Sequence, residues 1–208
     1  MPATGLEAPI ARLVEPIYAW RTWTLIGSRD GSWVRLAPIA GDGRPWPPQQ
    51  PATSSCTRHR SHLRPELGCT CGLHAVTDPQ ELRRARDPAV LGSVALWGRV
   101  VQHEHGFRAS LAYPQRLRLV CYLCFSLWGR RAPGEPAVVV RHRGGRMVPL
   151  CEPHLELSRR YGYRVPRILA AGAVESALLA TYAVDPLREL DRAERSGATG
   201  SSRGSTIS

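Results

Sequence analysis

The stretch that decides the fold runs from residue 121 to residue 154 and reads CYLCFSLWGRRAPGEPAVVVRHRGGRMVPLCEPH. It begins with a Cys-x-x-Cys pair, Cys121 and Cys124, and ends with a Cys-x-x-His pair, Cys151 and His154. Two ligands separated by two residues lie on the same side of a tight turn, and two such pairs complete the tetrahedron that zinc prefers. The sequence therefore predicts a closed zinc site made of three thiolates and one imidazole.

The residues between the two pairs predict a β-hairpin. Two apolar runs, residues 137–141 and 146–150, flank a turn at Arg143-Gly144-Gly145, and Pro153 is typical of the first turn of a helix. This order of Cys pair, hairpin and helix resembles a treble-clef zinc finger over residues 121–162. The resemblance implies a fold only, because treble-clef proteins include nucleic-acid binders, protein adaptors and some nucleases.

A second group of possible ligands lies upstream and has four members: Cys56, His59, Cys69 and Cys71. Gly68 and Gly72 flank its Cys-x-Cys half and permit the backbone angles of a tight loop. His62 and His74 lie close enough in sequence to be alternative ligands, so the choice of the fourth ligand stays open. Both groups offer four ligands, which favours structural zinc over catalytic zinc with its open position.

Together the two groups use all six cysteines of the chain. Closely spaced cysteines in a reducing compartment are more often metal ligands than disulfides. The first twenty residues contain Glu7 and Glu15 and lack the apolar run of a secretory signal. The longest apolar stretch, residues 168–184, is interrupted by Glu175 and is too short for a membrane span. We therefore expect a cytoplasmic protein with no membrane partner.

The chain is strongly basic, with 28 basic against 17 acidic residues and a formal net charge of +11. Every Lys/Arg position is Arg, which is typical of a GC-rich genome, but codon usage does not explain the excess of positive charge. A charge balance of this kind favours anionic partners such as nucleic acid, phosphate-bearing molecules or acidic protein surfaces.

Arginines are concentrated around the second cysteine group. The candidates for nucleic-acid contact are Arg130, Arg131, Arg141, Arg143, Arg146, Arg159 and Arg160. Guanidinium groups on rigid zinc-held loops can donate paired hydrogen bonds to phosphate oxygens. A smaller set, Arg58, Arg60 and Arg64, lies around the first cysteine group. An acidic protein surface is an alternative partner for the same side chains.

Three segments of the first half of the chain resemble a family of bacterial proteins, common in actinobacteria, to which no function is assigned. They are residues 69–75 (CTCGLHA), 94–109 (VALWGRVVQHEHGFRA) and 112–114 (AYP), and the opening YAWR of residues 18–21 also fits. The resemblance covers roughly residues 17–120 and implies no activity. Its His103-Glu104-His105 triplet reads most simply as a polar turn, although two histidines on one strand face can also bind a metal.

These features predict an α+β protein with two structural zinc ions. We expect a flexible N-terminus (1–15), a β-hairpin-rich module with the first zinc-stabilised loop (16–120), a treble-clef-like zinc module with C-terminal helices (121–186) and a mostly disordered tail (187–208). The expected helices span residues 154–161 and 167–183, with a short one after Asp78. The leading function is a non-enzymatic module that binds nucleic acid. The alternatives are an adaptor for an acidic protein partner and a zinc-dependent enzyme.

Overall fold

The computed structural model describes residues 11–40, 43–58, 61–126, 134–161 and 167–188. This part of the chain is mostly β-sheet with a few helices, as the sequence predicted. Its strands are β1 (Ala11–Gly27), β2 (Val34–Ala37), β3 (Ala52–Thr53), β4 (Leu73–Val76), β5 (Val90–His103), β6 (Gly106–Leu119), β7 (Val138–Arg141), β8 (Arg146–Leu150), β9 (Ile168–Ala170) and β10 (Asp185–Pro186). Its helices are α1 (Tyr122–Ser126), α2 (Glu152–Arg160) and α3 (Ala171–Tyr182), with 3₁₀ turns at Pro79–Arg84 and Arg143–Gly145.

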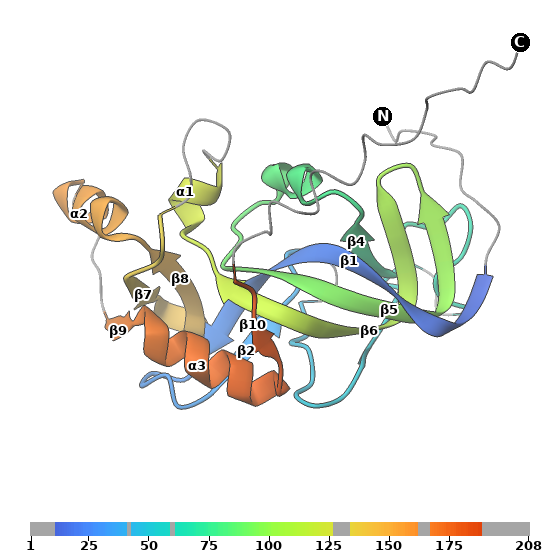
Figure 1. Cartoon of the computed structure of the whole chain (residues 1–208), viewed down its shortest axis with the longest axis horizontal. Helices are drawn as coiled ribbons and strands as arrows, with labels where there is room; N and C mark the ends of the chain where they lie inside the picture. The colour runs from blue at the N-terminus through green and yellow to red at the C-terminus, as the bar shows by residue number, and fades with distance from the viewer. Residues whose placement is uncertain (1–10, 41–42, 59–60, 127–133, 162–166, 189–208) are drawn as a thin grey trace, which may run out of the picture.

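Four strands pair in a closed circuit. Antiparallel pairings join β1 to β5, β5 to β6 and β6 to β4, and the pair Trp20–Val76 joins β4 back to β1. The three long strands run side by side along the length of the molecule (Figure 1). The β5–β6 turn needs Gly106, because a Cβ atom there would lie 2.2 Å from the carbonyl oxygen of Ala75. This close approach is what lets β4 pair with β6.

The far end of β1 belongs to a second group of strands. Leu25 of β1 pairs with Leu36 of β2 and with Met147 of β8, and the sheet continues through β7 to β9. Because β1 has members of both groups as neighbours, it connects the four-strand circuit to the region that carries the second cysteine group.

Aromatic side chains link α3 to the main core. Trp23 of β1 is fully buried, and its ring meets that of Trp46 edge-on, with centroids 5.3 Å apart and an interplanar angle of 87°. Tyr182, at the end of α3, is also fully buried. Its hydroxyl accepts a hydrogen bond from the backbone N–H of Leu36 at 3.0 Å and donates one to the carbonyl oxygen of Trp46 at 2.9 Å.

The start of the last helix differs from the sequence prediction. The helix expected from residue 167 begins at Ala171, because Ile168–Ala170 pairs with β7 as a strand. The long strand β6 continues through Pro114, and its register shifts where Val94 pairs with this proline. A bulge at this point accommodates a proline, which lacks an N–H to donate.

The two chain ends also extend the ordered structure. β1 begins at Ala11, inside the stretch that was expected to be loosely ordered. Leu187, expected in the tail, is buried, and its N–H donates to the carbonyl oxygen of Leu117 at 2.8 Å. None of the helices in the described ranges is long and apolar enough to span a membrane.

A Tyr182→Phe substitution tests the link between α3 and the core. It leaves the N–H of Leu36 and the carbonyl of Trp46 without their partner, which costs about 1–3 kcal/mol in urea unfolding at neutral pH. Burial raises the pKa of Tyr182 to about 12. The folded state thus favours the neutral phenol. The stabilisation that the neutral phenol gives to the folded state is lost as the pH rises from about 10, the ordinary tyrosine pKa, through the raised pKa.

The variant should therefore lose less stability than the native protein across this alkaline range. Tyr161→Phe is the matched control, because Tyr161 is 72% exposed. Equal alkaline losses in the native protein and in Tyr182→Phe would contradict the assignment.

Candidate metal centres

The second cysteine group forms a compact cluster. One ligand atom from each of Cys121, Cys124, Cys151 and His154 lies within 4.8 Å of all the others. The Nδ1 atom of His154 is 3.4, 3.3 and 3.1 Å from the sulfurs of Cys121, Cys124 and Cys151, and the sulfurs of Cys124 and Cys151 are 3.6 Å apart. Zn–S bonds of about 2.3 Å place two sulfurs of a tetrahedron about 3.8 Å apart. The four ligands therefore fit one zinc ion.

Local structure positions these ligands. Cys121 directly precedes α1, which carries Cys124, and Cys151 follows β8 as the N-cap residue of α2. Pro153 occupies the first turn of α2, where its missing N–H has no role, and the N–H of His154 donates to the carbonyl oxygen of Cys151 at 3.1 Å. Apolar side chains of Val140, Leu150 and Leu155 pack around the thiols.

The first cysteine group forms the other cluster, which consists of Cys56, His62, Cys69 and Cys71. The sulfurs of Cys56 and Cys69 are 3.8 Å apart, and the Nε2 atom of His62 lies 4.0 Å from the sulfur of Cys71. The Nδ1 atom of His62 lies 2.8 Å from the carbonyl oxygen of Leu63. A proton on Nδ1 that donates to this carbonyl leaves Nε2 as the ligand atom.

The choice of histidine departs from the leading sequence prediction. Predicted ligand His59 lies outside the described residues, and His62, the open alternative, lies with the three cysteines. The other alternative, His74, is engaged elsewhere, because its Nε2 atom lies 2.8 Å from the carbonyl oxygen of Thr70.

The donor chemistry of both clusters suits zinc. Burial raises the pKa of the Cys151 thiol to about 12, and it also raises the pKa values of Cys71 and Cys124, because desolvation disfavours the thiolate. A divalent cation reverses this preference, since a coordinating thiol is deprotonated. Three sulfurs and one imidazole are a donor set typical of structural zinc. The two Cys₃His groups therefore fit two structural zinc ions.

Two arginines from the β5–β6 hairpin hold the loop of the first cluster. Arg108 is 3% exposed, and its Nη1 atom donates to the carbonyl oxygens of Glu66 (3.3 Å), Cys71 (3.1 Å) and Cys69. Arg99 donates to the carbonyl oxygen of Pro65 at 2.7 Å and pairs with the Glu66 carboxylate at 3.1 Å. Neither arginine was singled out from the sequence, although each is a charged residue within an apolar strand.

Gly72 permits the same arrangement. Its φ of 126° is rarely adopted by residues with a side chain, and a Cβ atom there would lie 3.0 Å from the Cβ of Arg108 and 3.1 Å from that of Pro65. The glycine therefore lets the Cys71 end of the loop lie directly on Arg108.

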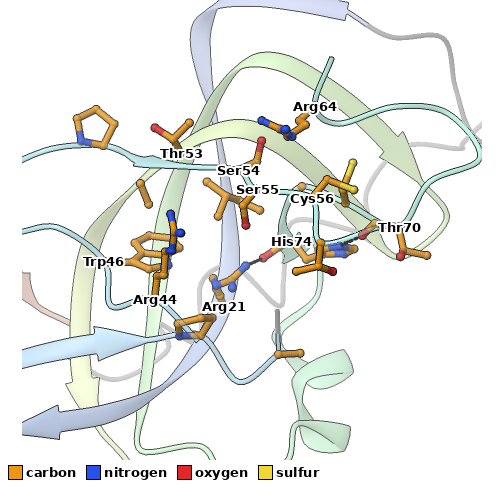
Figure 2. A pocket seen from close by; sticks show the side chains of 18 of the residues that line it. Arg21, Arg44, Trp46, Thr53, Ser54, Ser55, Cys56, Arg64, Thr70 and His74 are labelled. Atoms are coloured by element: carbon orange, nitrogen blue, oxygen red, sulfur yellow. Dashed lines mark hydrogen bonds between the residues drawn. The ribbon is translucent and has the colours of Figure 1, made fainter. Parts of the chain in front are cut away.

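A cavity of about 710 Å³ borders the first cluster, with Cys56, Cys69 and Cys71 in its wall (Figure 2). Four arginines line it: Arg21, Arg44, Arg58 and Arg64. The lining residues that the structure describes include no Asp or Glu. Sequence reasoning found Arg58 and Arg64, but not Arg21 and Arg44, which lie in segments distant from the cysteines.

The arginines predicted to contact nucleic acid around the second cluster differ in their partners within the protein. Arg130 and Arg131 lie outside the described residues, and only the backbone of Arg143 is described. The ion pairs of the remaining set are Arg146–Asp87 and Arg159–Glu156, both at 2.9 Å, while Arg141 donates to the carbonyl oxygen of Gly27 at 3.3 Å. Arg160, exposed at the end of α2, makes no ion pair with any residue of the described ranges.

Comparisons with known proteins give no relative. No protein-family model, no curated protein and no solved structure matches the chain. Its function must therefore be argued from the chemistry and geometry of its own residues.

Metal analysis tests the ligand assignment of the first cluster. Purified protein should contain two zinc ions per chain, and His62→Ala should lower the content to about one after dialysis against a mild chelator, because three ligands bind zinc more weakly than four. His59→Ala is the matched control and should keep both ions. Loss of zinc from the His59 variant but not from the His62 variant would reverse the assignment.

A second prediction concerns the arginine that holds this loop. Arg108→Met leaves three buried carbonyl oxygens without a donor and should destabilise the fold by about 3 kcal/mol in urea unfolding. It should also release zinc from the first cluster at lower chelator concentration, while the second cluster keeps its ion. Arg116→Met, an exposed position on the same strand, is the control. Equal zinc retention in both variants would show that Arg108 does not support the cluster.

Proposed function

We propose that this chain is a zinc-stabilised, non-enzymatic binding protein that contacts nucleic acid through arginine side chains. The observation that carries the proposal is the placement of arginines beside both metal clusters. Arg159 and Arg160 end the helix that Cys151 and His154 begin, and four arginines line the cavity next to the first cluster. The net charge of +11 adds a long-range attraction for polyanions.

The zinc sites support a structural rather than a catalytic role. A catalytic zinc keeps one position open for water or substrate, whereas each cluster here supplies four protein ligands. Three thiolates also make the metal electron-rich, which weakens it as a Lewis acid. The zinc-dependent enzyme is for this reason the least supported alternative.

The order of elements around the second cluster supports the treble-clef likeness as part of the proposal. The Cys121/Cys124 pair comes first, the antiparallel strands β7 and β8 follow, and α2 begins at the Cys151/His154 pair. This likeness, the bacterial family and a reducing cytoplasmic location form one consistent proposal, because all three suit a small protein held together by zinc thiolates.

The ion pairs of Arg146 and Arg159 do not prevent phosphate binding. Both pairs are exposed, with side-chain exposures of 45% and 42% for Arg146–Asp87 and of 50% and 66% for Arg159–Glu156. Exposed pairs of this kind contribute only about 0–1 kcal/mol, so a phosphate can displace the carboxylate at little cost. The two pairs also show that the same arginines bind carboxylate groups. This observation favours an acidic protein surface as the second candidate partner.

Salt-dependent binding tests the proposal. Fluorescence anisotropy with mixed-sequence RNA and DNA oligonucleotides should show binding at about 50 mM salt that weakens steeply by about 200 mM, because each phosphate contact releases counterions. Arg146→Gln and Arg160→Gln should each lower the slope of log K against log salt by about 1. Arg116→Gln, with the same loss of charge on an exposed strand position, is the control.

Two results would contradict nucleic-acid binding. One is a folded, zinc-loaded protein that binds neither RNA nor DNA at low salt, which would favour the acidic protein partner. The other is an equal loss of slope in all three variants, which would mean that only net charge is detected.

A further inference from the structure

The cavity beside the first cluster has the size and charge of a ligand site. Its volume of about 710 Å³ falls within the range of roughly 300–1,000 Å³ that small-molecule sites occupy. Its wall brings together β1, the connector that precedes β3 and the loop of the first cluster (Figure 2). Segments distant in the sequence thus form one concave surface.

The charge of this surface has one sign. Four arginines line one cavity whose described lining contains no carboxylate. Like charges in one partly enclosed site repel each other, and the walls reduce the screening by water. A bound anion removes this repulsion. Because Arg44 and Arg58 are exposed, the case for an anion site depends mainly on Arg21, which is half-buried.

Arg21 is the most informative of the four. It reaches from β1 into the cavity between Trp46 and His74 (Figure 2), donates to the carbonyl oxygen of His74, and places its guanidinium carbon 5.2 Å from the centre of the Trp46 ring. Its Nε atom is buried and donates to no acceptor within the described part of the chain. Desolvation lowers the pKa of Arg21 to about 10, and no carboxylate offsets that burial.

Neutral donors lie on the same surface. The side chains of Thr53, Ser54, Ser55 and Thr70 line the cavity and are drawn around Arg21 in Figure 2. Hydroxyl groups next to arginines suit the several oxygens of a phosphate, because a hydroxyl donates one hydrogen bond while guanidinium groups donate in pairs. A single carboxylate has only two oxygens for so many donors.

We propose that this cavity binds the phosphomonoester group of a nucleotide-sized ligand, with Arg21 as its anchor. The dianionic group gives the Nε atom of Arg21 the acceptor that it lacks among the described residues, and the cavity has room for one nucleotide but not for a duplex. The same chemistry is present in a free nucleotide and at the phosphorylated end of an oligonucleotide. The inference rests in part on the proposed function, because the cavity arginines are among those that carry it, but the contacts proposed around the second cluster lie outside the cavity.

Calorimetric titration of the full-length, zinc-loaded protein tests this site. The probes are inorganic phosphate, AMP, acetate, and one trinucleotide with either a 5′-phosphate or a 5′-hydroxyl. We expect saturable 1:1 binding of AMP, weaker binding of phosphate, and none of acetate. AMP binding without binding of either trinucleotide identifies a free nucleotide as the source, whereas preference for the 5′-phosphorylated trinucleotide identifies a nucleic-acid end.

Variants show where the probe binds. Arg21→Gln should weaken AMP binding roughly tenfold or more, because it removes a buried charged donor. Arg44→Gln, on the connector, should weaken it as well and serves as the second variant if Arg21→Gln does not fold. Arg29→Gln removes the same charge at an exposed turn outside the cavity and should leave the affinity within about twofold.

Three results would overturn the proposal. They are no saturable binding of phosphate, AMP or the 5′-phosphorylated trinucleotide, an equal loss of affinity in the Arg29 and Arg44 variants, and equal binding of the 5′-hydroxyl and 5′-phosphorylated trinucleotides. Arg160→Gln should leave AMP binding unchanged, so failure here and failure of the nucleic-acid proposal are distinguishable.

Discussion

Coordination by four side chains takes the place of an apolar core in the loop from Ser54 to Gly72. The described residues of this loop form neither helix nor strand, so hydrogen bonds of regular structure do not fix its path. Its position depends on the Cys₃His cluster from one side and on the buried guanidinium of Arg108 from the other. Because this loop is one wall of the arginine-lined cavity, the shape of the cavity depends on the metal site.

A single strand connects this loop to the second metal site. β1 carries Arg21 into the cavity, pairs with β5 along most of its length, and ends beside β8, which leads directly to Cys151. The same strand therefore lines the cavity beside the first metal site and pairs with the strand that leads to the second. Each zinc ion would stabilise a loop that β1 alone does not hold. Metal binding thus explains how short segments rich in Gly and Pro keep one position.

The local features of the sequence predicted the second cluster fully and the first cluster in part. Cys-x-x-Cys and Cys-x-x-His pairs fix two ligands each through one turn, so their partners follow from spacing alone. The fourth ligand of the first cluster depends on the path of an irregular loop with three nearby histidines, and spacing cannot choose among them. Arg99 and Arg108 reach the loop through pairing between distant strands, so the sequence marks them as unusual charged residues in an apolar strand but does not name their partners. The start of α3 was misplaced because β7 takes Ile168–Ala170 as a partner.

The hydrogen bond from the Tyr182 hydroxyl to the carbonyl oxygen of Trp46 joins residues 136 positions apart in the chain. Trp46 lines the arginine cavity, so the last helix fixes part of a wall that the first quarter of the chain builds. During translation, the residues of that wall leave the ribosome long before α3 has been synthesised. During synthesis the nascent chain can bind its first zinc ion early, but the cavity reaches its final form only after the C-terminal helix has emerged and docked.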